Sequence, residues 1–145
     1  MVRLAQFGIA VGALGIVLTL MGLFPGVTGV EPTPGIGIVQ ILMAITGFSL
    51  LIAGAFIYVK YTFYEKQRAT LAQQIGFRLS LTGLMLGAMV GLADILGFGS
   101  NVRTVTTDIF FGPWQAVGLL GGFLMASIGV LVYAVTGTMD DDSSA

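Results

Sequence analysis

Four long apolar runs constrain the fold of this chain more than any other feature. They cover Leu4–Phe24, Ile36–Val59, Leu79–Phe98 and Trp114–Thr136. At about 1.5 Å of rise per residue, a helix of about 20 residues crosses the hydrocarbon core of a bilayer. Only 9% of the 145 residues are charged, whereas about 25% are charged in an average soluble domain. The sequence therefore predicts an all-α integral membrane protein with four transmembrane helices.

The lysine and arginine residues predict how this chain is oriented. On one side of the predicted spans lie Arg3, Lys60, Lys66, Arg68 and Arg78, and on the other side lies only Arg103. Because cytoplasmic loops carry the excess of basic residues, both termini are predicted to be cytoplasmic. The first apolar run is longer than the core of a signal peptide, so we expect it to be retained. We thus expect a multi-pass cell-membrane protein with one domain, residues 1–138, and a flexible acidic tail, residues 139–145.

The segment after the second run is basic and aromatic. No Gly or Pro interrupts Tyr58–Ile75, so the second helix is expected to continue beyond the bilayer. Tyrosine rings and lysine ammonium groups are typical of the membrane interface. We favour a solvated helix end here. The alternative is a docking surface for a protein partner or for anionic lipid.

Comparison of the chain with itself predicts a tandem duplication. When residues 1–62 are placed on residues 76–137 without a gap, 14 positions are identical. The identical pairs include Arg3 with Arg78, Gln40 with Gln115, Gly47 with Gly122 and Phe48 with Phe123. Each copy would be a helical hairpin, and the two copies would share one topology in the membrane. Such parallel repeats are related by a pseudo-two-fold axis along the membrane normal.

Small residues at helical spacing predict which helix faces meet. In the third run, Ser80, Gly83, Gly87, Gly91 and Asp94 recur every three or four residues and share one face. Helices in lipid associate through close van der Waals contact, which small residues permit. The predicted packing positions are Gly8, Gly12, Gly83, Gly87, Gly91, Gly118, Gly122 and Gly129. We interpret these glycines as packing positions without a ligand, and we expect the second hairpin to pack more tightly than the first.

Four polar residues are predicted to cluster near the outer surface of the membrane. They are Thr19, Gln40, Asp94 and Gln115. Asp94 is the one acidic residue inside a predicted span, and Thr19 is its counterpart under the ungapped comparison. A carboxylate at this depth needs a partner or water. We favour a structural role, in which Asp94 anchors an outer loop, over a functional role in proton or ion transfer.

The side-chain chemistry of the chain limits its possible functions. Cysteine and histidine are absent, so we expect no enzyme, no metal site and no cofactor. No basic cluster predicts nucleic-acid binding. The favoured hypothesis is a non-catalytic structural, assembly or accessory subunit of a larger membrane complex. The alternative is a small homo-oligomeric transporter or channel. The expected partners are the lipid bilayer and other membrane subunits or copies of this chain.

Overall fold

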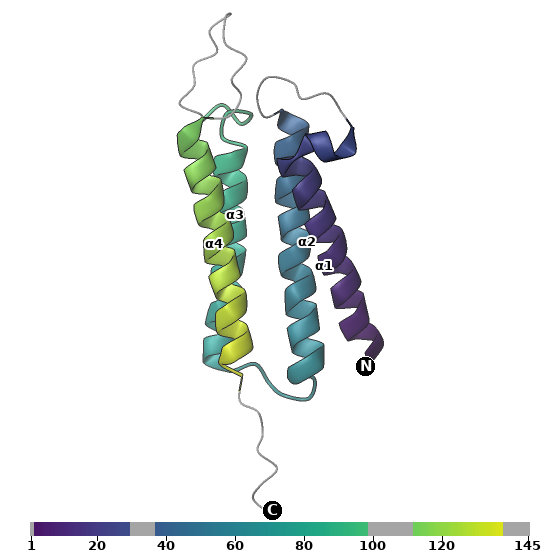
Figure 1. Cartoon of the computed structure of the whole chain (residues 1–145). Coiled ribbons are helices and arrows are strands. Elements are labelled where there is room, and N and C mark those ends of the chain that lie inside the picture. The colour runs from purple at the N-terminus through teal and green to yellow at the C-terminus, as the bar shows by residue number, and fades with distance from the viewer. Residues whose placement is uncertain (1, 30–36, 99–111, 138–145) are drawn as a thin grey trace, which may run out of the picture.

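The fold is an all-helical bundle, seen in a computed structural model that describes residues 2–29, 37–98 and 112–137. Its elements are α1 (Val2–Leu23), a short 3₁₀ helix η1 (Pro25–Thr28), α2 (Ile38–Phe63), α3 (Leu71–Gly91) and α4 (Pro113–Val135). Successive helices run up and down, so the start of α1, the α2–α3 connection and the end of α4 lie at one end (Figure 1). We call this the basic end, because it carries Lys60, Lys66, Arg68 and Arg78. Arg103, residues 30–36 and 99–111 of the two connections at the opposite end, and the predicted acidic tail lie outside the described residues.

The helices form two hairpins, α1 with α2 and α3 with α4, which pack along their lengths. The hairpins meet mainly through α2, which touches both α3 and α4, while α1 lies on the outside (Figure 1). Phe48 of α2 stacks on Phe123 of α4 with ring centroids 4.0 Å apart. Three helices of the described chain, α1, α2 and α4, are long and apolar enough to cross a membrane. The third helix is less apolar because its first half contains Gln73, Gln74 and Arg78.

The second helix continues past the end of its apolar run at Val59, but only to Phe63 and not through to Ile75. α2 ends at Phe63, and a bend leads to Thr70, where α3 begins. The Thr70 hydroxyl accepts a hydrogen bond from the Gln73 N–H at 3.2 Å, and the Gln73 side chain accepts one from the Thr70 N–H at 3.1 Å. This reciprocal capping box stabilises a helix start that neither Gly nor Pro marks.

The third helix lies earlier in the chain than its apolar run. It covers Leu71–Gly91 instead of Leu79–Phe98, and residues 92–97 form turns. The turn ends at Gly97, whose φ of 83° is a left-handed conformation that glycine adopts readily. Ser80, Gly83, Gly87 and Gly91 are buried on one face of α3, as predicted. Asp94 does not belong to α3, because the helix ends before it and Asp94 lies in the turns that follow.

Glycines bring the two backbones of the first hairpin into contact. Gly8, Gly15 and Gly22 of α1 are spaced seven residues apart, as are Gly47 and Gly54 of α2. We call these residues the first seam. A Cβ atom on Gly8 would lie 2.9 Å from the Gly54 carbonyl oxygen and 2.8 Å from the Tyr58 nitrogen. No side chain larger than a hydrogen atom fits at such positions, so glycine sets the separation of the helices.

The second hairpin has a matching seam of Gly76 and Gly83 on α3 and Gly122 and Gly129 on α4. A Cβ on Gly76 would lie 2.6 Å from the Gly129 oxygen and 2.9 Å from the Tyr133 nitrogen. Gly76 therefore takes the place of Gly8, a shift of 68 residues along the chain, whereas Gly129 takes that of Gly54, a shift of 75. α3 thus matches α1 at a shift of 68 residues, which is seven residues less than the shift of 75 used in the ungapped comparison.

The expectation that the second hairpin packs more tightly is wrong. The same kinds of backbone atoms meet in both seams, and the distances are alike. A Cβ on Gly54 would lie 2.5 Å from the Gly12 nitrogen, and a Cβ on Gly83 would lie 2.5 Å from the Ala126 nitrogen. Larger side chains in the first hairpin do not separate its helices, because the residues at the seam itself are glycine in both.

Candidate functional site

Gln40 and Gln115 cap the two helices that begin at the end opposite the basic end. The Gln40 side chain accepts a hydrogen bond from the Gly37 N–H at 2.9 Å, and the Gln115 side chain accepts one from the Gly112 N–H at 2.8 Å. Each glutamine therefore binds one of the free N–H groups at a helix start. The two residues occupy equivalent positions in the two hairpins, and this capping gives them a structural role.

Thr19 has a different environment from Asp94. Its hydroxyl donates to the Gly15 carbonyl at 2.8 Å within α1, and a Cβ on Gly47 would meet the Thr19 hydroxyl at 2.7 Å. Thr19 therefore lies beside the first seam. The residue in the same position of the second hairpin is Gly87 and not Asp94. Among the described residues, no hydrogen bond joins any two of the four residues of the predicted polar cluster.

At the end of the second hairpin opposite the basic end, two buried polar groups lack partners within the described part of the chain. Both carboxylate oxygens of Asp94 and the Nε2 atom of Gln115 are shielded from solvent and form no hydrogen bond with a described residue. The Gln115 side chain is only 7% exposed. Burial without a hydrogen bond costs about 1–3 kcal/mol for a neutral group and more for a charge. This pair is therefore the least satisfied polar feature in the described chain.

The predicted packing glycines lie at three kinds of position. Gly8, Gly12, Gly83, Gly87, Gly122 and Gly129 lie within the hairpins, where the paired helices meet. Gly91 faces Ile45 of α2, and Gly118 lies against the Val90 side chain. The prediction omitted other glycines of the two seams, which are Gly15, Gly22, Gly47, Gly54 and Gly76. Their seven-residue spacing is the sequence signal that could have identified them.

At the basic end, the α2–α3 connection and the first turn of α3 cap the last turn of α4. The Tyr64 hydroxyl donates to the Ala134 carbonyl at 2.6 Å, and Gln73 Nε2 donates to the Tyr133 carbonyl at 3.3 Å. The Thr70 hydroxyl donates to the Thr136 carbonyl at 3.3 Å. The last four carbonyls of a helix have no partner within the helix, so these bonds both satisfy α4 and join it to the connection. Sequence analysis missed this role of Tyr64, Thr70 and Gln73.

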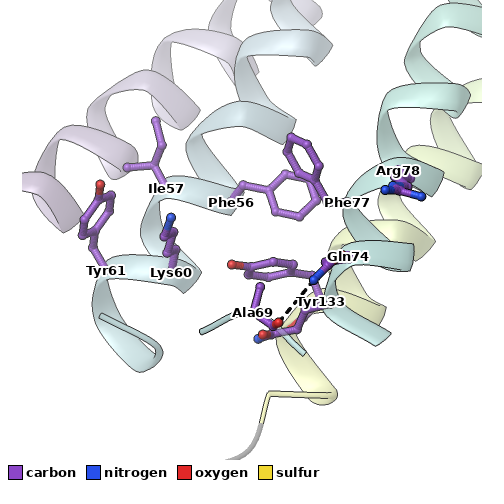
Figure 2. Close-up of a pocket in the computed structure, with 10 residues that line it drawn as sticks. Phe56, Ile57, Lys60, Tyr61, Ala69, Gln74, Phe77, Arg78 and Tyr133 are labelled. Atoms are coloured by element: carbon purple, nitrogen blue, oxygen red, sulfur yellow. Dashed lines mark hydrogen bonds between the residues drawn. The ribbon is translucent and has the colours of Figure 1, made fainter. Parts of the chain in front are cut away.

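Beside this cap lies a pocket between the two hairpins, with a cavity volume of about 540 Å³. Its inner wall is aromatic, because Phe56 packs edge-to-face on Phe77 at 5.3 Å and on Tyr133 at 5.1 Å between centroids. Figure 2 shows this wall between α2 and the α3–α4 pair. The residues that line the pocket are Phe56, Ile57, Lys60, Tyr61, Ala69, Gln73, Gln74, Phe77, Arg78 and Tyr133.

The charges around this pocket are positive. Lys60 lies in the last turn of α2, and Arg78 lies about two turns into α3. Neither side chain forms an ion pair with a described residue, and the Lys60 ammonium lies 6.0 Å from the centre of the Tyr61 ring. The pocket thus combines an apolar aromatic wall with two cations that have no carboxylate partner among the described residues, a pattern suited to binding an amphipathic anion. Comparisons with protein-family models, with curated proteins and with solved structures found no match for this chain.

Proposed function

We propose that this chain is a non-catalytic structural, assembly or accessory subunit of a larger membrane complex. The observation that carries the proposal is the construction of the two seams, where backbone lies directly against backbone. Such seams leave no space for a solute between paired helices, so we place the function on the outside of the hairpins. There, the side chains are mostly apolar.

The membrane arrangement that goes with this proposal has four spans. α3 packs against α4 along its length, which supports a third helix that crosses the membrane with the others despite its polar first half. We place both termini and the α2–α3 connection in the cytoplasm, because the basic end carries the surplus of Lys and Arg. The matching seams support a tandem duplication of one hairpin, in which the α3–α4 connection became seven residues longer than the α1–α2 connection.

The face of α1 that points away from α2 is the surface where we place another membrane subunit. α1 packs along its length on α2, and only 11% of its most apolar stretch is buried. Ala13 lies on the exposed face of this helix. A small side chain there permits close approach of a further helix.

The test is recovery of a complex after extraction of the tagged chain from its native membrane in mild detergent. We expect a partner in fixed stoichiometry, and Ala13→Phe should remove it. Ala53→Phe is the matched control, because Ala53 is equally an exposed alanine, on α2. Recovery of this chain alone, or equal loss with both variants, would contradict the proposal.

A second candidate function is a small transporter or channel formed by several copies of this chain. The buried, unpartnered groups of Asp94 and Gln115 favour it, because ionisable groups at membrane depth often mark ion pathways. The closed seams require any such pathway to run between protomers. Asp94→Asn should leave the fold intact, since an amide replaces an unpartnered carboxylate of the same shape. Ion flux in liposomes that Asp94→Asn abolishes would favour the transporter, whereas no flux from the unmodified chain would exclude it.

A further inference from the structure

We propose that the pocket between the hairpins at the basic end binds one anionic glycerophospholipid. The phosphate would lie between Lys60 and Arg78, and the acyl chains would descend along the aromatic wall. This assignment goes beyond the proposed subunit function and does not depend on it.

The two cations, Lys60 and Arg78, lie on opposite sides of the pocket. Lys60 comes from the first hairpin and Arg78 from the second, and both line the cavity. The described part of the chain offers no carboxylate to either of them, since the nearby Glu65 does not line the pocket. An anion bound in the pocket would therefore meet a cation from each hairpin, and a phosphodiester has the required charge and acceptor oxygens.

Arg78 lies too far along α3 to be at the water-exposed start of the helix. It lies about two helical turns from the start of α3, where the apolar part of that helix begins. A cation at this level is costly without a partner and is usually paired or extended toward the headgroups. A lipid phosphate lies at that level of the membrane, whereas a soluble anion would have to leave water to reach it.

The Tyr133 hydroxyl is a polar group on the aromatic wall that a lipid can bind. Tyr133 is only 8% exposed, and its hydroxyl forms no hydrogen bond with a described residue, although its carbonyl accepts one from Gln73. Figure 2 shows its ring reaching into the pocket between the hairpins. The hydroxyl at the tip of this mostly buried ring is not itself buried, so it can donate a hydrogen bond to a glycerol or phosphate oxygen of the bound lipid. The Phe56 and Phe77 rings then contact the acyl chains.

The experiment is native mass spectrometry of the full chain in detergent, titrated separately with phosphatidylglycerol, phosphatidylcholine and glycerol 3-phosphate. We expect one phosphatidylglycerol molecule to bind in preference to phosphatidylcholine. Each cation near an anionic headgroup contributes about fivefold, so the double variant K60Q/R78Q should bind phosphatidylglycerol about 25-fold more weakly. Tyr133→Phe keeps the ring and should weaken binding about threefold, the effect of one hydrogen bond.

The control is K66Q/R68Q, which removes the same charge from exposed residues of the α2–α3 connection that do not line the pocket. It should leave the affinity within about twofold at 150 mM salt, where exposed charges are screened. Far-UV circular dichroism of each variant verifies that the helices are retained. Equal affinity for both lipids, equal loss with the control pair, or equally tight binding of glycerol 3-phosphate would overturn the proposal.

Discussion

Adding one methyl group at Gly54 tests whether the first seam sets the separation of α1 and α2. The new Cβ would lie 2.5 Å from the Gly12 nitrogen and 2.6 Å from the Gly8 oxygen. Both are backbone atoms that no rotamer change can move. Ordinary van der Waals contact begins at 3.4 Å, so the two helices have to separate by about 1 Å, enough to lose a quarter to a half of each contact energy.

The expected magnitude for Gly54→Ala follows from two opposing effects. Overpacking a close contact costs about 1–3 kcal/mol, while replacing glycine by alanine inside a helix returns at most about 1 kcal/mol. The net result should be a loss of about 1–2 kcal/mol in the free energy of unfolding. Gly12→Ala is the matched control, because Gly12 lies across from Gly54 and yet its own Cβ would meet nothing within 4 Å.

The assay is unfolding of both variants in mixed micelles with increasing sodium dodecyl sulfate, followed by circular dichroism. Gly12→Ala should be neutral or stabilising by up to about 1 kcal/mol, and Gly54→Ala should unfold at a lower detergent fraction than the unmodified chain. If Gly12→Ala destabilises the protein as much as Gly54→Ala, or if Gly54→Ala has no effect, contact between the backbones at the seam does not set the helix separation.

Two further substitutions test hydrogen bonds between elements. Tyr64→Phe should cost about 1 kcal/mol and speed hydrogen exchange in the last turn of α4, because the bond to the Ala134 carbonyl is lost; Tyr61→Phe, which removes a hydroxyl without such a bond, should change neither. Ser80→Ala removes the buried 2.7 Å bond from α3 to the Ala126 carbonyl of α4 and should lower unfolding stability by about 0.6 kcal/mol. Ser127→Ala is its control, since the Ser127 hydroxyl bonds within its own helix, and a larger effect there would refute the interhelical role of Ser80.

The helical class and the buried face of α3 could be predicted from the sequence, whereas the register of the first helices could not. A slip of seven residues turns a helix by only about 20°, so it leaves the same small residues on the same face. Either Gly8 or Gly15 can therefore be matched to Gly83, and in both registers the small residues of the two helices fall on one face. Only the contacts with the opposite helix distinguish the two registers, and these depend on atoms far away in the sequence.

The limits of α3 and the pocket were missed for different reasons. The capping box at Thr70 and Gln73 is a readable signal, but it lies in a polar stretch where hydropathy predicts no span. The pocket depends on α2, α3 and α4 together, and no local pattern predicts how two hairpins sit beside each other. Tyr64 likewise caps α4 from a distance of 70 positions, a relation with no periodicity to detect.

Because glycine has no side chain, closing the two seams freezes no rotamers. The pairing enthalpy comes from dispersion between main-chain atoms, together with Cα–H groups that face carbonyl oxygens. The long side chains on the outer faces stay free to reorient as the surrounding lipid changes. The molecule thus keeps a fixed skeleton while its surface adapts, so exchanging one lipid species for another should leave the helix spacing unchanged.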